Sequence, residues 1–153
     1  MQTTFFQGKN RLELVWRQRS VPVCFRRGKG QTLLVRLPYA PDNQTWLRAG
    51  RRRKPNWRPP PKGYWDLPAS WFDDLVNRSL SRWARVYVIQ PYRRQEVCAP
   101  ACWRAEGHEC ECSCMGANHG SQSTAGQWFV VSESFAVLWG ERTLACRLIE
   151  KTE

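Results

Sequence analysis

Histidine is scarce in this 153-residue chain, occurring only at His108 and His119, both inside a cysteine-rich segment. A Ser/His/Asp triad needs a histidine beside its nucleophile, so no such triad can be assembled outside that segment. The chain also has no run of eighteen apolar residues, which excludes a helix across a membrane. Its first nine residues lack the charged start and apolar stretch of a signal peptide. We therefore expect a cytoplasmic protein with no membrane partner.

Acidic residues are also few, 13 against 24 lysines and arginines, which gives a net charge of +11. The imbalance is uneven: residues 1–97 carry 20 basic and six acidic side chains, and residues 98–153 carry four and seven. Scattered charge would serve solubility equally well, but a clustered excess is typical of a protein with a polyanionic partner. The densest cluster comprises Arg48, Arg51, Arg52, Arg53, Lys54, Arg58 and Lys62.

Five of the seven cysteines and both histidines lie between residues 98 and 119. Cys110, Cys112 and Cys114 alternate with other residues, so in an extended segment their thiols share one side and can share one metal ion. Cys98 and Cys102 are one helical turn apart, a spacing that suits a two-ligand knuckle. This pattern predicts a structural zinc ion, because thiolate-rich sites are usually closed rather than catalytic.

A disulfide framework and unreactive thiols are the alternatives to zinc. An odd number of cysteines and the absence of a secretory start favour zinc. Cys24 and Cys146 lie far from the cluster and are expected to be small core residues. We expect Cys98 and Cys102 to supply one pair of ligands and the other four candidates to supply a second pair, with the choice among those four left open. The candidate zinc ligands are Cys98, Cys102, Cys110, Cys112, Cys114 and His119.

Hydrophobic periodicity predicts two helices. A short one, capped by Asp42, runs through Leu47 and ends at Gly50; a longer one runs from Pro68 to about Trp83. The longer helix has a basic side with Arg78 and Arg82, and its apolar stripe consists of Trp71, Phe72, Leu75, Val76, Leu80 and Trp83. Strands are predicted at residues 11–16, 21–26, 32–37, on both sides of the proline-rich turn at 59–63, and at 86–89, 128–131, 135–139 and 142–149.

This order of elements predicts an α+β fold. We expect a two-layer sandwich of a mostly antiparallel sheet with two helices, capped at one end or edge by the zinc knuckle. Residues 1–153 are expected to form a single domain. Within it, residues 1–97 form the basic part, residues 98–120 a zinc-binding insertion, and residues 121–153 a β-hairpin that completes the sheet.

Residues 32–89 contain a strand that ends at Tyr39, a short helix, the basic run 51–54, Trp57 and Trp65 flanking a turn, and the helix led by Pro68. This outline resembles the HepA-related (HARP) domain that accompanies annealing helicases. The resemblance implies binding to branched DNA or to junctions of single and double strands. Residues 98–120 resemble cysteine-rich segments of small uncharacterised bacterial and phage proteins, and this likeness implies no function.

Three functions follow from these patterns. The first is a non-enzymatic nucleic-acid-binding protein, with DNA favoured over RNA, whose cations neutralise phosphates and whose tryptophans stack on unpaired bases. The second is a protein-binding accessory or inhibitor from a phage, a mobile element or a nucleoprotein complex. The third is a small metal-dependent hydrolase. The candidate nucleic-acid contacts are Arg51, Arg52, Arg53, Lys54, Trp57, Arg58, Lys62, Trp65, Arg78 and Arg82.

Overall fold

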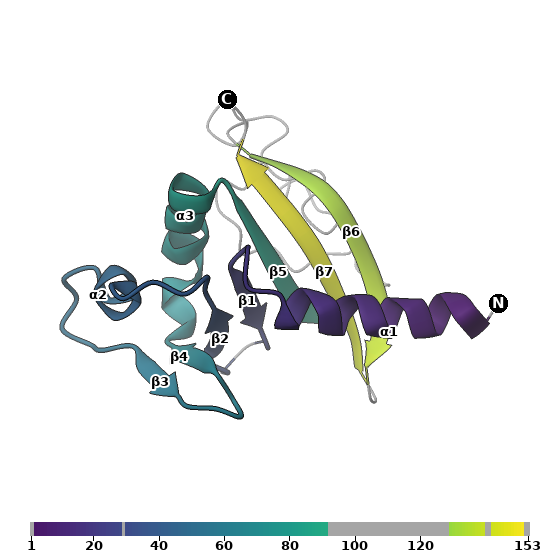
Figure 1. The fold of residues 1–153 in the computed structure, drawn as a ribbon, viewed down its shortest axis with the longest axis horizontal. Helices are drawn as coiled ribbons and strands as arrows, with labels where there is room; N and C mark the ends of the chain where they lie inside the picture. Colours follow the sequence, from purple (N-terminus) through teal and green to yellow (C-terminus); the bar gives the residue numbers. More distant parts are fainter. Residues whose placement is uncertain (1, 29, 92–128, 140–141, 152–153) are drawn as a thin grey trace.

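A seven-stranded sheet forms the centre of the protein, in the order β3-β4-β2-β1-β5-β7-β6 (Figure 1). The structure, a computed structural model, describes residues 2–28, 30–91, 129–139 and 142–151. Neighbouring strands are antiparallel except for β1 and β5, which are parallel. The predicted α+β class and mostly antiparallel sheet are confirmed. The strands are β1 Val23–Arg26, β2 Leu33–Arg36, β3 Asn56–Arg58, β4 Tyr64–Leu67, β5 Arg85–Pro91, β6 Phe129–Trp139 and β7 Arg142–Lys151.

Two local hairpins form one half of the sheet. Strands β1 and β2 pair with Cys24 opposite Val35, and Gly28 and Gly30 in their connection have φ of 122° and 81°, which glycine adopts at little cost. Strands β3 and β4 pair with Trp57 opposite Trp65 on either side of the proline-rich turn. Both hairpins were predicted, because turn residues separate short β-rich runs in the sequence.

The long helix is α3, Phe72–Trp83, preceded by a 3-10 turn at Ala69–Trp71. Its predicted apolar stripe, except for the half-buried Trp83, is buried against one face of the sheet, where it meets Cys24, Val35 and Val88. Asp73 and Asp74 lie in the first helical turn, where the positive end of the helix dipole stabilises negative charge. The buried residues of the stripe are Trp71, Phe72, Leu75, Val76 and Leu80.

The N-terminal segment differs from its prediction. Residues 11–16 belong to helix α1, Gln2–Arg17, and not to a strand. Alternation of Leu12 and Leu14 suggested a strand, but Leu12 and Val15 have helical spacing and are both buried, whereas Leu14 is 68% exposed. Helical geometry therefore describes this segment, because a strand would place Leu12 and Leu14 on one face.

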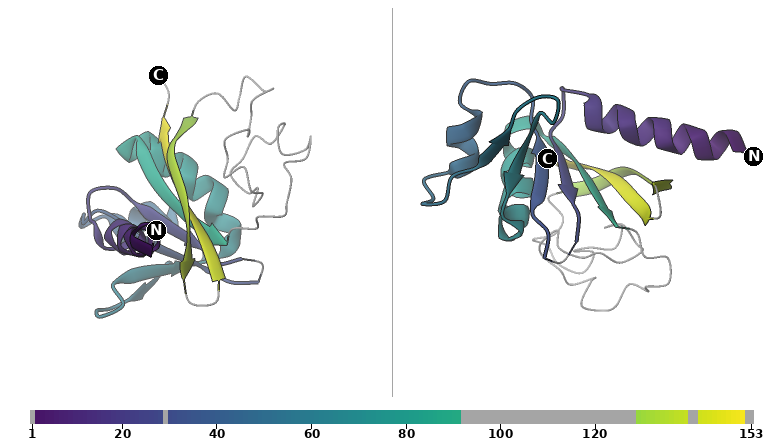
Figure 2. Two further views of the ribbon diagram at one scale, coloured as in Figure 1. Left: turned by 90° about the vertical axis from the view of Figure 1, so that its right-hand side faces the viewer. Right: turned by 90° about the horizontal axis from the view of Figure 1, so that it is seen from below.

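Helices cover both faces of the sheet, so the predicted two-layer arrangement is wrong (Figures 1 and 2). Helix α1 packs on Val23 and Ile89, while α3 packs on Cys24 and Val88. Successive residues of a strand point to opposite faces, so the two helices lie in separate layers. The third helix, α2, is short and spans Asn43–Arg48.

The sheet is larger than predicted and its last strands differ in detail. Strand β6 is one strand rather than two, with a register irregularity between Val131 and Glu133. Strand β7 lies between β6 and β5, and β5 is buried as expected for the 86–89 run. The predicted zinc knuckle falls at residues 98–120, outside the described residues. In the part of the chain that the structure describes, no helix has the length and apolar character needed to cross a membrane.

Candidate nucleic-acid interface

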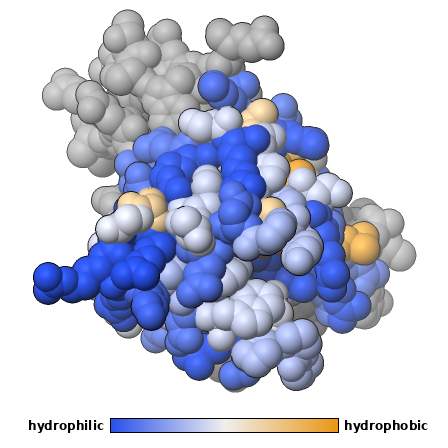
Figure 3. Space-filling view, turned by 60° about the vertical axis from the view of Figure 1, so that its left-hand side comes forward, coloured by the Kyte–Doolittle hydropathy of each residue, from blue (hydrophilic) through white to orange (hydrophobic). Residues whose placement is uncertain are grey.

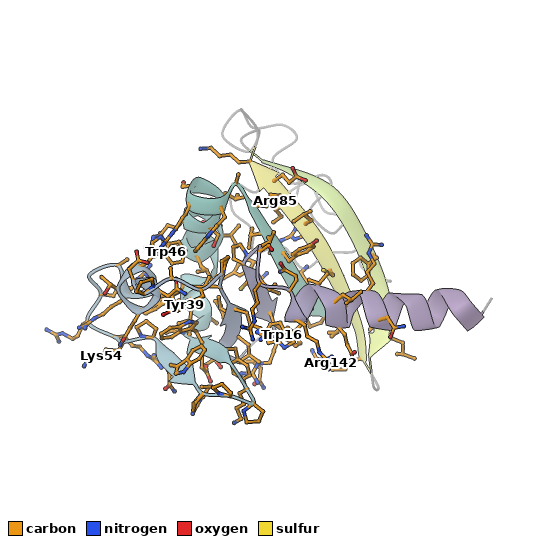
Figure 4. The ribbon with its side chains drawn as sticks, viewed as in Figure 1. Trp16, Tyr39, Trp46, Lys54, Arg85 and Arg142 are labelled. Carbon is orange, nitrogen blue, oxygen red and sulfur yellow. The ribbon has the colours of Figure 1, made fainter. Side chains whose placement is uncertain are left out.

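The basic run 51–54 lies in the loop between α2 and β3, which we call the basic loop. Its side chains divide into two groups. Arg52, Arg53 and Lys54 are exposed, and among the described residues none of the three has an ion-pair partner. Figure 4 shows Lys54 at the outer edge of the molecule. These three cations are therefore available to an anionic ligand.

Arg51 has a different position from its neighbours. Its guanidinium lies 2.8 Å from the Asp74 carboxylate of α3 and 4.5 Å from the centre of the Trp71 ring. Arg48 donates a 2.6 Å hydrogen bond from Nε to the Arg51 carbonyl oxygen. Arg51 therefore anchors the basic loop to α3 and to the 3-10 turn that precedes it.

Arg78 and Arg82 of α3 are engaged in the same way. Both guanidinium groups lie over the Trp46 ring, at 4.4 and 5.4 Å from its centre, and Arg78 donates to the Trp46 carbonyl oxygen. Burial lowers the pKa of Arg78 below its ordinary value. Arg82 is 3.0 Å from the Asp42 carboxylate, so Asp42 holds an arginine and makes no side-chain cap on α2. The expected cap is therefore absent, and both arginines fasten α2 to α3.

The β3–β4 hairpin carries four further candidates. Arg58 lies 3.4 Å from the Asp66 carboxylate, whereas Lys62 is exposed at the turn. The Trp57 and Trp65 rings meet with 5.0 Å between centroids. Trp65 packs against the core, whereas Trp57 is 45% exposed. Trp65 thus supports Trp57 from the protein side, and Trp57 offers a ring to solvent.

A pocket of about 510 Å³ lies beside Trp57, past the end of β2. We call it the aromatic pocket. Its walls come from the connection between α1 and β1, the segment that leads from β2 into α2, and the β3–β4 hairpin. Tyr39, which is 82% exposed, lies in the segment between β2 and α2 (Figure 4). The lining residues are Gln18, Arg19, Arg36, Leu37, Tyr39, Ala40, Pro41, Asn43, Gln44, Trp57, Pro60, Gly63 and Trp65.

Two arginines of the aromatic pocket, Arg19 and Arg36, were not predicted as site residues. Arg36 donates a 2.7 Å hydrogen bond from Nη1 to the Trp16 carbonyl oxygen and lies 5.3 Å from the centre of that ring. Burial, and then the nearby charges of Arg19 and Arg17, lower the pKa of Arg36. Among the residues that the structure describes, no carboxylate lines the pocket. The described lining of the pocket is therefore positively charged.

The basic loop and the aromatic pocket are neighbours. Gln44 of α2 lines the aromatic pocket and also a second, open hollow together with Arg48 and Lys54. Figure 3 turns the side with α2 and the β3–β4 hairpin toward the viewer. Hydrophilic residues cover most of this side, and a paler group of intermediate hydropathy lies among them. One side of the molecule thus combines cations with exposed aromatic rings.

The candidate metal ligands cannot be placed in the fold. All six lie between residues 98 and 119, outside the described residues. Within the described ranges, no group of histidine, cysteine and acidic residues is arranged to hold a metal ion. Cys24 and Cys146 are buried, one in each of the two core clusters, as predicted. Burial raises the pKa of the Cys24 thiol to about 12, so this thiol is neutral at physiological pH.

Fold and site together describe an α+β protein with a cationic and aromatic surface at one end of its sheet. Comparisons with protein families, with curated proteins and with solved structures find no match to this chain. The chemistry of this surface is therefore the basis for a proposed function.

Proposed function

We propose that this chain is a non-enzymatic nucleic-acid-binding protein. In this proposal, the basic loop contacts backbone phosphates and the neighbouring aromatic rings stack on bases. The observation that carries it is that the hollow lined by Lys54 of the basic loop adjoins, through Gln44, the aromatic pocket with its exposed Tyr39 and Trp57. Cations that track a backbone beside rings that stack on bases are the two components of single-strand recognition.

Electrostatics supports the same function. The basic loop has three cations without ion-pair partners among the described residues, and the whole chain has a net charge of +11. Each phosphate that is neutralised releases condensed counter-ions, so affinity falls steeply as salt is added. A positively charged surface with few carboxylates also speeds the encounter with a polyanion.

Two expectations from the sequence belong to this proposal. The resemblance of residues 32–89 to the HARP domain favours DNA over RNA. A structural zinc ion bound by residues 98–120 would stabilise the C-terminal third of the chain, because zinc bound to a closed set of ligands contributes directly to folding.

Binding across a salt series tests the proposed function. Labelled single-stranded, duplex and forked DNA and RNA are titrated with purified protein, and the affinity is measured by fluorescence anisotropy. We expect the logarithm of the affinity to fall linearly with the logarithm of the salt concentration. The double variant Arg52→Ala/Arg53→Ala should reduce this slope by about two for duplex, since each phosphate contact contributes about 0.9.

The double variant Arg85→Ala/Lys151→Ala is the matched control. It removes the same number of charges from exposed positions at the β5 and β7 ends (Figure 4 labels Arg85). Equal losses in both variants would reduce the effect to net charge and contradict a defined basic interface. Absence of binding to every nucleic acid at moderate salt would overturn the proposal and leave the protein-binding accessory role as the function to test by affinity capture.

A further inference from the structure

We propose that the aromatic pocket binds one unpaired nucleotide, with its base against Tyr39 and Trp57 and its phosphate beside Arg19 and Arg36. This inference rests on the proposed function and deepens it, because it names a single-stranded segment as the ligand. The pocket's volume of about 510 Å³ falls within the range of small-ligand sites, roughly 300–1,000 Å³.

The aromatic wall suits the flat face of a base. Tyr39 is 82% exposed and Trp57 is 45% exposed, and both line the pocket. Trp57 is held from behind by Trp65, whose ring centroid is 5.0 Å away, and by the β3–β4 pairing of these two residues. A ring that is already held in place loses little conformational freedom when a base stacks on it, so more of the stacking energy appears as affinity.

The cationic wall suits a phosphate. A guanidinium group has five N–H donors, and Arg36 uses one of them to bond the Trp16 carbonyl oxygen at 2.7 Å. That bond orients Arg36 at the wall of the pocket. In the described part of the chain, Arg19 has no ion-pair partner. An anion between these arginines would relieve the repulsion between their charges.

The same lining excludes other ligand classes. Two arginines without a carboxylate repel cationic ligands, including methylated lysine side chains that otherwise bind aromatic cages. A purely apolar segment would remove water from the remaining N–H donors of both guanidinium groups without replacing those hydrogen bonds, which costs free energy. A ligand with a flat ring and an adjacent negative charge satisfies both walls.

Pairing state decides whether a base can enter. In a duplex, stacked neighbours cover both faces of each base, so a paired base reaches a pocket only after it is flipped out of the stack at a cost in free energy. An unpaired base exposes its faces without that cost. The aromatic pocket therefore selects single strands, while the basic loop contacts phosphates of either form.

The test compares single-stranded and duplex oligonucleotides of equal length, as DNA and as RNA, together with a single-stranded oligonucleotide in which every base is replaced by an abasic site. Variants Tyr39→Ala and Trp57→Ala remove exposed rings, and Leu138→Ala is the control because Leu138 is 40% exposed on β6, at the other edge of the sheet. Circular dichroism spectra check that each variant is folded.

We expect tighter binding to single strands than to duplex or abasic strands. Tyr39→Ala and Trp57→Ala should each weaken single-strand binding by about 5- to 150-fold, the range for loss of one stacked base, with duplex binding and Leu138→Ala unchanged. The pocket would be overturned if the protein bound duplex and single strands with equal affinity and neither ring substitution changed that affinity. If Arg52→Ala/Arg53→Ala still weakened binding in that case, the proposed function would remain intact. If the wild-type protein bound none of these nucleic acids, both the pocket and the proposed function would be overturned. Preference for DNA or for RNA strands identifies the natural source of the unpaired nucleotide.

Discussion

Four arginines of the described chain lie over tryptophan rings: Arg36 on Trp16, Arg51 on Trp71, and Arg78 and Arg82 on Trp46. Each of these contacts joins residues from different elements. Arginine favours such positions because its planar, weakly hydrated guanidinium stacks on aromatic faces. A basic residue can therefore act in folding or in binding, and its partners distinguish the two roles.

Arg51 and Arg52 are adjacent in sequence but differ in role: Arg51 contacts other parts of the fold, whereas Arg52 is exposed. Arg51→Ala removes the Asp74 ion pair and the Trp71 contact, so we expect it to lower the free energy of unfolding by about 1 kcal/mol, both partners being partly exposed. Arg52→Ala should change that free energy by less than about 0.5 kcal/mol and weaken nucleic-acid binding instead. Urea unfolding followed by tryptophan fluorescence measures the first effect and anisotropy the second. The reverse pattern would contradict the assignment.

Cys24 gives a pH dependence whose sign follows from its burial. Burial raises its pKa from 9.0 to about 12, against the opposing charges of Arg26 and Arg147. Between these values the unfolded chain releases the thiol proton while the folded protein retains it. Its stabilising contribution is therefore complete below about pH 9 and declines as pH rises toward 12, by up to about 1.4 kcal/mol per pH unit.

The variant Cys24→Ala isolates this contribution. We expect its unfolding free energy to decline less steeply than that of the wild type between about pH 8 and about pH 10, because it lacks the thiol. Urea titrations of both proteins at several pH values provide the measurement. Parallel declines would show that the Cys24 thiol is not held neutral in the folded state.

Helix α1 shows, at the scale of elements, how a packing face overrides an alternating pattern. Residues 11–17 contain both a strand-like alternation and a helical i, i+3 pair. Packing selects the helix: Leu12 and Val15 are buried against Val137 and Leu144 on the sheet face opposite α3. Helix α3 and the two hairpins had stronger local patterns and were predicted correctly.

Two substitutions distinguish helix from strand at α1. We expect Leu12→Ala to lower the free energy of unfolding by about 2–5 kcal/mol, the cost of removing a buried leucine side chain. Leu14→Ala should cost less than about 0.5 kcal/mol, because Leu14 is 68% exposed. In a strand, both residues would share a face, so the two substitutions would lower the free energy of unfolding by similar amounts. Thermal or urea denaturation compares the two variants directly.

Charge is segregated at the scale of the whole molecule. The basic excess belongs to residues 1–97, and residues 98–153 are mildly acidic. Strands β6 and β7 from this second part complete the edge of the sheet opposite β3, and the basic loop precedes β3 directly. Because the exposed cations of the basic loop lie beside β3, we expect a nucleic acid to approach the β3 end of the sheet.

Zinc binding is predicted to affect the whole molecule, because the candidate ligands lie in the segment that links β5 to β6 in sequence. We expect about one zinc ion per chain by elemental analysis, since a closed structural site holds a single tetrahedral ion. Cys110→Ser/Cys112→Ser should lose the metal and lower the melting temperature, whereas Cys24→Ala should retain it. Wild-type protein that contains no zinc after expression in zinc-supplemented medium would refute the prediction.

The sequence by itself determined the elements with strong local patterns and the net positive charge of the chain, from which a polyanionic partner is predicted. Helix α3, the two hairpins, the buried β5 and the core cysteines follow from periodicity, turn residues and composition, which act over a few neighbouring positions. The basic loop was visible as a run of like charges.

Only the tertiary structure decided which cations contact other parts of the protein and where the aromatic pocket lies. Arg51, Arg78 and Arg82 meet their partners 23, 32 and 40 residues away in sequence, a separation that no local pattern encodes. The aromatic pocket combines Arg19, Arg36 and Trp57 from three segments of the chain. The order of the strands and the packing of helices on both faces of the sheet bring these distant segments together. The properties of each side chain depend on the neighbours that it meets there.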